Sequence, residues 1–255
     1  MKFLYLIIFF VVGTLFGSFF TVVGSRLPNN EDFIRGRSHC DNCKHELSFL
    51  DMIPIISYII LHGRCRYCKK KISSLSSYME FFTGALFSLS YYIFGLSYEL
   101  FISLGIVALL IIISVSDISY FIIPDQVLIF FSGYFIIINC LNNGILYALF
   151  SILSGFIMFS VMYLIMLLGN FLFKKESLGG GDIKLMFVAG LVLHPFLCLF
   201  VIFFASLLAL PLSLIILKKK HINLVPFGPF LLISFMFVYF TKIDINMLIN
   251  FIKNI

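Results

Sequence analysis

Two aspartates at the edges of apolar segments are the residues of this sequence best placed to do chemistry. Asp117 closes the apolar run FISLGIVALLIIISVSD, and Asp182 ends LGGGD and leads directly into IKLMFVAGLVL. An ionisable side chain at or inside the hydrocarbon of a bilayer is energetically costly, so a functional role is its default interpretation. Simpler interpretations stay open, because Asp117 could mark a helix end at the interface and Asp182 could be a carboxylate favoured by a helix dipole.

If the two carboxylates meet, they could hydrolyse a peptide bond. One would act as a general base on a water, and the other as a general acid toward the scissile carbonyl. Three residues without side chains precede Asp182 and would let a substrate backbone approach closely: Gly179, Gly180 and Gly181. Asp125, which follows Pro124 at the expected start of a helix, is a rival partner, although an aspartate there is more often a helix cap.

Four cysteines in a polar segment have the spacing of a metal site. They form two C-x-x-C pairs separated by 21 residues, Cys40 with Cys43 and Cys65 with Cys68. Each pair can chelate from a tight turn, and four thiolates fill a tetrahedral zinc site without an open position for catalysis. We therefore expect a structural zinc that folds the segment. Substitute ligation by His39 or His45, and four thiols without a metal, are the alternatives.

The composition makes the chain a membrane protein. Of its 255 residues, 61% are hydrophobic and 12% are charged, which is too little polar surface for a soluble domain. About 20 apolar residues cross a hydrocarbon core of roughly 30 Å, and runs of that kind recur along the chain. We expect an all-α polytopic fold with about eight transmembrane helices, at 3–23, 77–96, 98–116, 126–142, 145–172, 183–193, 195–217 and 224–241. His194-Pro195 breaks the long apolar stretch after Asp182, as a hairpin or a re-entrant element.

The distribution of basic residues predicts the topology. If the loop at 24–76 is cytoplasmic, three loops on that side hold 15 of the 18 lysines and arginines. Because two of the expected crossings lie between them, Asp117 and Asp182 should both be at the cytoplasmic face. The formal charge of +6 then reflects topology, with the lipid bilayer as a partner and no nucleic acid. We expect a first transmembrane helix at 1–23, a zinc-binding loop domain at 24–76, and a membrane core at 77–255.

Five segments, in order, resemble the type IV prepilin peptidases, which belong to the GxGD class of intramembrane aspartyl proteases. The first is similar to the family's first-helix exit, the second to its zinc loop, the third and fourth to its two aspartate motifs, and the fifth to its last-helix signature. They are FGSFFTVVGSRLP (16–28), RSHCDNCKHELSFLDMIPIISYIILHGRCRYCKKKIS (37–73), DISYFIIPD (117–125), GGGDIK (179–184) and VPFGPFLL (225–232). The resemblance covers most of the chain.

The resemblance implies a function for these residues. Asp117 and Asp182 would be the catalytic pair, and the four cysteines would hold zinc. The family cleaves the short basic leader of prepilin or pseudopilin precursors on the cytoplasmic side of the bacterial inner membrane. Many members then methylate the new amino terminus with S-adenosylmethionine. Glu80 corresponds to a family glutamate linked to substrate or methyl transfer, and its alternative is a helix-entry residue at the interface.

Two departures from the family pattern concern methyl transfer. Thr21 stands where the family usually has asparagine, and the residues before Glu80 lack the usual arginine-tyrosine-proline. For a substrate with a basic leader, we expect Glu80, Asp125 and the un-ionised member of the Asp117–Asp182 pair to form a locally negative entrance to the site, a negative mouth.

Two other classes of protein remain as alternatives. A proton-coupled transporter fits the helix count but not the cysteines, and a zinc-loop membrane assembly protein leaves both aspartates without a role.

Overall fold

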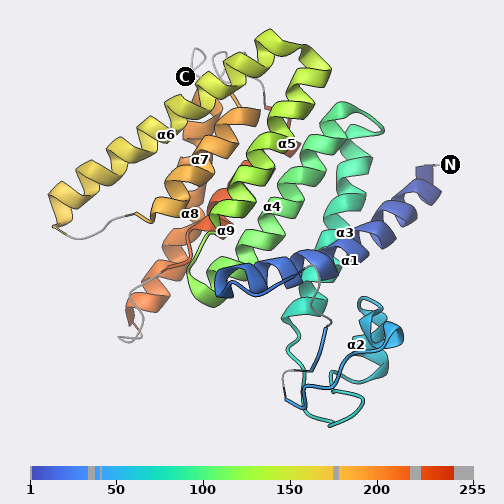
Figure 1. The fold of residues 1–255 in the computed structure, drawn as a ribbon. Helices are drawn as coiled ribbons and strands as arrows, with labels where there is room; N and C mark the ends of the chain where they lie inside the picture. Colours follow the sequence, from blue (N-terminus) through green and yellow to red (C-terminus); the bar gives the residue numbers. More distant parts are fainter. Residues whose placement is uncertain (1, 34–37, 41, 175–177, 219–224, 244–255) are drawn as a thin grey trace. The chain divides into compact units, whose positions relative to one another are not determined.

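The computed structural model describes residues 2–33, 38–40, 42–174, 178–218 and 225–243 (Figure 1). Apart from two isolated β-bridges, the regular structure of these residues is helical, as the sequence predicts. Contacts within the chain divide it into two compact units, at 1–96 and 97–255.

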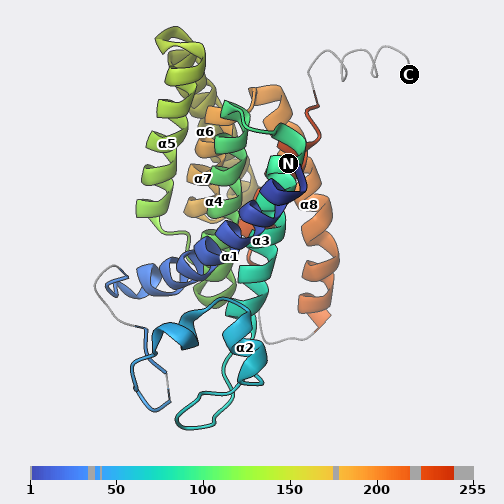
Figure 2. The ribbon, with the colours of Figure 1, turned by 90° about the vertical axis from the view of Figure 1, so that its right-hand side faces the viewer.

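The N-terminal unit is a helix pair that carries the cysteine loop. Its elements are α1 (Lys2–Arg26), η1 (Leu27–Asn29), η2 (Phe49–Met52), α2 (Ile56–Ile60) and α3 (Leu75–Phe94). Figures 1 and 2 show α1 crossing α3, against which it packs. The backbones come close at Gly13, where an added Cβ would lie 2.8 Å from the Cα of Gly84. Small residues at a crossing allow this approach in membrane helices, where dispersion and packing drive association.

The C-terminal unit is a bundle built around α4. Its helices are α4 (Tyr98–Tyr120), α5 (Asp125–Asn143), α6 (Ile145–Phe173), α7 (Gly180–Val192), α8 (Pro195–Lys218) and α9 (Gly228–Phe240). Helix α4 packs against α5 and α9, and α6 lies beside α5 and α7 (Figures 1 and 2). Most of α4 is buried, which explains why its sequence is apolar on every side up to Asp117.

A helix occupies each of the eight segments expected to cross the membrane. Among the described residues, five of these helices are long and apolar enough to span a bilayer, namely α1, α4, α5, α6 and α8. Helix α7 has 13 residues, and so does α9. The count of eight crossings therefore stays a prediction. The break at His194-Pro195 is confirmed, because α7 ends at Val192 and α8 begins at Pro195.

Candidate active site and metal centre

Asp117 lies in the last turn of α4. The helix continues past the predicted end at 116 to Tyr120, and Phe121 closes it in the left-handed conformation, with φ of 56°. The Phe121 N–H donates to the Asp117 carbonyl at 2.9 Å. The Asp117 side chain is 6% exposed, and its Oδ2 accepts a hydrogen bond of 3.1 Å from the N–H of Gly228, the first residue of α9. The start of α9 therefore orients this carboxylate.

Asp182 lies in the first turn of α7 and is 8% exposed. Its backbone N–H donates to the carbonyl of Gly179, the residue that precedes the helix, at 3.2 Å. The structure brings Asp182 close enough to Asp117 for the two carboxylates to interact electrostatically. Neither carboxylate forms a salt bridge with a described residue. Two buried acids thus lie within electrostatic range of each other with no cationic partner among the described residues, an arrangement that lets a pair share one proton.

The three glycines before Asp182 have different surroundings. An added Cβ at Gly181 would lie 2.8 Å from the Cβ of Ile123, so the space beside this glycine is already filled. At Gly180 nothing lies within 4 Å of an added Cβ, and at Gly179 the one atom within that distance is Oδ2 of Asp182, at 3.3 Å. Room for a substrate backbone therefore exists beside Gly180 and not beside Gly181.

Asp125 is not a helix cap, contrary to the expectation from sequence. Pro124 holds the N-cap position of α5 without a side-chain cap hydrogen bond, and Asp125 is the first helical residue. Its carboxylate binds the ammonium of Lys184 on α7, at 2.7 and 2.8 Å. Because this charge is neutralised, Asp125 is poorly suited to form part of a negative mouth or to partner Asp117.

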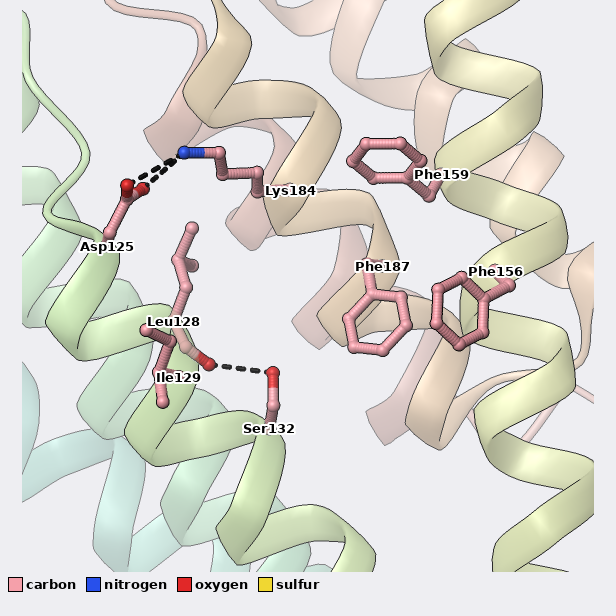
Figure 3. Close-up of a pocket in the computed structure, with 8 residues that line it drawn as sticks. All are labelled: Asp125, Leu128, Ile129, Ser132, Phe156, Phe159, Lys184 and Phe187. Atoms are coloured by element: carbon pink, nitrogen blue, oxygen red, sulfur yellow. Dashed lines mark hydrogen bonds and ion pairs between the residues drawn. The ribbon is translucent and has the colours of Figure 1, made fainter.

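The Asp125–Lys184 ion pair borders an open groove of about 460 Å³ between α5, α6 and α7 (Figure 3). The remaining lining is apolar and aromatic apart from one hydroxyl, and consists of Leu128, Ile129, Ser132, Phe156, Phe159 and Phe187. Figure 3 shows Lys184 reaching toward Asp125 while Phe187 of α7 lies beside Phe156 of α6. Asp117 and Asp182 do not line this groove, so it is separate from the carboxylate pair.

The four cysteines converge as the sequence predicts. Their sulfur atoms all lie within 4.8 Å of one another, with 3.8 Å between Cys40 and Cys68 and 4.0 Å between Cys43 and Cys65. A tetrahedral zinc with Zn–S bonds of about 2.3 Å requires sulfurs about 3.8 Å apart. The cluster therefore fits such an ion, and it could hold one with these four ligands. His45 packs against Tyr67, with 3.7 Å between ring centroids, and neither His45 nor His39 is in the cluster.

The two halves of the cluster share one backbone design. In each, the residue after the second cysteine has a positive φ, at 56° for Lys44 and 58° for Lys69, and its N–H donates to the carbonyl of the first cysteine. The N–H of the first cysteine in turn donates to the carbonyl of the residue five positions later, which is His45 for Cys40 and Lys70 for Cys65. Backbone hydrogen bonds from Cys43 and Asn42 lower the pKa of Cys40, whereas burial and the neighbouring thiols raise the pKa of Cys43, so the thiols of the cluster ionise unequally.

Glu80 lies near the start of α3 and is 6% exposed. Its Oε2 accepts a hydrogen bond of 2.8 Å from the N–H of Ile55, and its Oε1 accepts a longer one, of 3.4 Å, from Ser76. Ile55 has φ of 63° and ψ of −51°, a conformation that β-branched residues rarely adopt. Glu80 therefore ties the cysteine loop to α3, a role that its position in the sequence does not reveal.

Comparison with known proteins agrees with this architecture. The family model described as "Bacterial Peptidase A24 N-terminal domain" matches residues 11–94, and that of the "Type IV leader peptidase family" matches residues 104–214. The first range contains all four clustered cysteines, and the second contains both buried aspartates. No solved structure matches the chain significantly.

Several curated relatives share the printed name prepilin leader peptidase/N-methyltransferase. The protein of Bacillus subtilis is 34% identical over 205 residues, which cover 79% of this chain and 79% of that protein. That of Vibrio cholerae is 31% identical over 94% of this chain and 98% of its own length, and that of Klebsiella pneumoniae is 31% identical over 71% and 82%. The chain belongs to the type IV leader peptidase family. It is a multi-pass membrane peptidase, and its resemblance to the prepilin peptidases is confirmed.

Proposed function

We propose that this chain is a membrane aspartyl endopeptidase that removes the short basic leader of type IV prepilin-like precursors, with Asp117 and Asp182 as its catalytic pair. The observation that carries the proposal is the meeting of two buried carboxylates from α4 and α7 with no cationic partner among the described residues. The names of the relatives supply the substrate class. A transporter or an assembly protein would not explain this combination.

The reaction follows from the two protonation states that the pair adopts when it shares one proton. The ionised carboxylate takes a proton from a water, which attacks the carbonyl carbon of the scissile bond. The protonated carboxyl donates to the carbonyl oxygen as negative charge develops there. The hydrogen bond from Gly228 holds Asp117 in one orientation, and the open side of Gly180 gives the substrate backbone room beside Asp182.

The zinc site has a structural role in this proposal. Cys40, Cys43, Cys65 and Cys68 would hold the ion, which supplies no chemistry to peptide hydrolysis because its four positions are filled by sulfur. Zinc binding would order the loop between α1 and α3, since the buried hydrophobic residues among the described part of this loop are two of the cysteines themselves, Cys40 and Cys65. Glu80 adds a second attachment for this loop on α3.

We also propose that the protein methylates the new amino terminus with S-adenosylmethionine as methyl donor. This second activity rests on the names of the relatives. The departures at Thr21 and before Glu80 lie in the N-terminal unit, where the family resemblance places methyl transfer. Mass spectrometry of the mature product, looking for an added mass of about 14 Da, separates a cleaved from a cleaved and methylated amino terminus.

For localisation, we propose the bacterial inner membrane with the carboxylate pair and the cysteine loop on the cytoplasmic side. The support is the charge distribution, because 15 of the 18 basic residues fall in three loops of the same predicted side or near the ends of the helices that flank them. Precursors with a basic leader and a hydrophobic helix would approach from that side. Labelling of single introduced cysteines by an impermeant maleimide in intact cells and in inverted vesicles tests the orientation.

The proposed activity is tested with the purified protein alone in liposomes. We expect cleavage of a prepilin-like precursor at the junction between its leader and its hydrophobic helix, seen as a mass shift of the product. A precursor with two bulky charged residues at the junction is the matched control and should remain intact. Absence of cleavage by a folded, zinc-loaded preparation would contradict the proposal and favour the transport or assembly alternative.

A further inference from the structure

One side chain lies at the junction of the three segments that form the carboxylate site. Ile123 belongs to the connection between α4 and α5, six residues after Asp117. Its Cβ would contact a Cβ added at Gly181, at 2.8 Å, and its Cδ1 one added at Gly228, at 3.1 Å. Gly181 directly precedes Asp182, and Gly228 donates the hydrogen bond to Asp117. Ile123 therefore contacts the backbone beside each of the two carboxylates.

The contact at Gly181 leaves no freedom for adjustment. The nearest atom of Ile123 there is its Cβ, which moves only with the backbone, whereas the contact at Gly228 involves the mobile end of the side chain. A Cβ at position 181 would need about 0.6 Å more room to reach an ordinary contact of about 3.4 Å. That displacement must enter either the first turn of α7, with Asp182, or the connection that follows Asp117.

The connection that carries Ile123 is attached on both sides. The Ser116 hydroxyl donates to the carbonyl of Ile122, which holds the connection against the end of α4. After Ile123, Asp125 forms its ion pair with Lys184, two residues beyond Asp182 on α7 (Figure 3). Ile123 thus sits between two attachments, one to the helix of Asp117 and the other to the helix of Asp182.

We propose that Ile123 is a positioning residue, whose side chain, seated on Gly181 and Gly228, sets the spacing of the Asp117 and Asp182 carboxylates. The proposal rests on the function proposed above. It gives a physical reason for the glycine at 181, where the three atoms nearest an added Cβ all belong to Ile123, whereas at Gly228 the space is shared by Asp117, Ile113 and Ile123. The half-exposed ion pair between Asp125 and Lys184 is a second, weaker tie between the start of α5 and α7. Ile123 does not contact the substrate in this role.

The test is a pair of compensating substitutions measured by cleavage kinetics in liposomes. Gly181→Ala should lower kcat about 10- to 100-fold with little change in KM, because a displacement of about 0.6 Å misaligns the reacting groups after the substrate has bound. Ile123→Gly in the same chain removes the opposing Cβ and should restore most of the lost kcat. Gly133→Ala in α5 is the matched control, since nothing lies within 4 Å of an added Cβ there.

Two results would overturn the proposal. The first is a Gly181→Ala enzyme with the wild-type kcat, and the second is a Gly181→Ala, Ile123→Gly enzyme no faster than Gly181→Ala alone. If Gly181→Ala does not fold, as judged by helical circular dichroism, the test is the kcat of the Ile123→Gly single variant. A lowered kcat in that variant supports the positioning role of Ile123, and a wild-type kcat overturns it. Asp117→Asn in the same assay distinguishes the two proposals, because cleavage by that variant overturns the catalytic pair itself.

Discussion

Replacing Glu80 should loosen the attachment of the cysteine loop to α3 if the new side chain lacks an oxygen that can accept the hydrogen bond from the Ile55 N–H. Glu80→Ala removes the acceptor of the Ile55 N–H, whereas Glu80→Gln keeps an oxygen at the same place. The hydrogen bond is part-buried, and leaving its donor without a partner costs at most about 1–3 kcal/mol. The strained backbone of Ile55 adds to the effect, because a conformation of this kind persists only while its surroundings hold it.

The free energy lost with this hydrogen bond can be measured as a faster hydrogen exchange of the Ile55 amide. A loss of about 1–3 kcal/mol corresponds to about a 5- to 150-fold faster exchange of the Ile55 amide in Glu80→Ala, since about 1.4 kcal/mol is tenfold. Glu80→Gln should stay much closer to wild type. The Lys69 amide, which donates to Cys65 in the second half of the metal cluster, is an internal control and should keep its protection in both variants.

Two outcomes would contradict a structural role of the Glu80 hydrogen bond. Unchanged exchange at Ile55 in Glu80→Ala would show that the hydrogen bond does not hold the loop. Equal deprotection in Glu80→Gln and Glu80→Ala would show that the negative charge, and not the acceptor oxygen, matters. Cleavage and methylation measured on the same variants would then separate a structural effect from a direct role: Glu80→Lys with unchanged cleavage of a basic-leader precursor removes Glu80 from the negative mouth.

The remaining predictions concern the metal, the ion pair and the bundle. Purified protein should contain one zinc per chain by elemental analysis, and Cys65→Ser should lose it while Cys140→Ser keeps it; equal zinc in both variants contradicts the cluster. Lys184→Met should lower the free energy of unfolding by at most about 1 kcal/mol, because the pair with Asp125 is half-exposed, and a larger loss would show that it is not an ordinary surface pair. Gly190→Ala should destabilise the bundle by about 1–3 kcal/mol in a denaturant titration, because the backbone of α6 lies 2.8 Å from the added Cβ. An unchanged midpoint would disprove the close crossing of α6 and α7.

Much of the site could be predicted from the sequence because its signals are local. Charged residues stand out in apolar runs, which drew attention to Asp117 and Asp182, and cysteine spacing predicts the metal cluster from two short turns. The break between α7 and α8 was predictable for the same reason, since proline acts on its immediate neighbour.

The features that sequence reasoning missed depend on distant partners. Gly228 contacts Asp117 from 111 positions away, and Glu80 binds a backbone N–H 25 positions away. Asp125 was expected to be a cap, because local preference favours that role after a proline, but Lys184 provides a charged partner 59 positions along the chain. Helix α4 runs beyond its apolar run because the Phe121 cap satisfies one more turn.

The central claim is that hydrolysis depends on both carboxylates of the pair. Asp117→Asn and Asp182→Asn preserve side-chain size, and an asparagine oxygen at 117 can still accept the Gly228 hydrogen bond, so both variants should remain folded by helical circular dichroism. Cleavage of a prepilin-like precursor by each purified variant in liposomes is the most direct measurement. Each substitution alone should abolish cleavage, and cleavage retained by either folded variant would contradict the assignment of Asp117 and Asp182 as the catalytic pair.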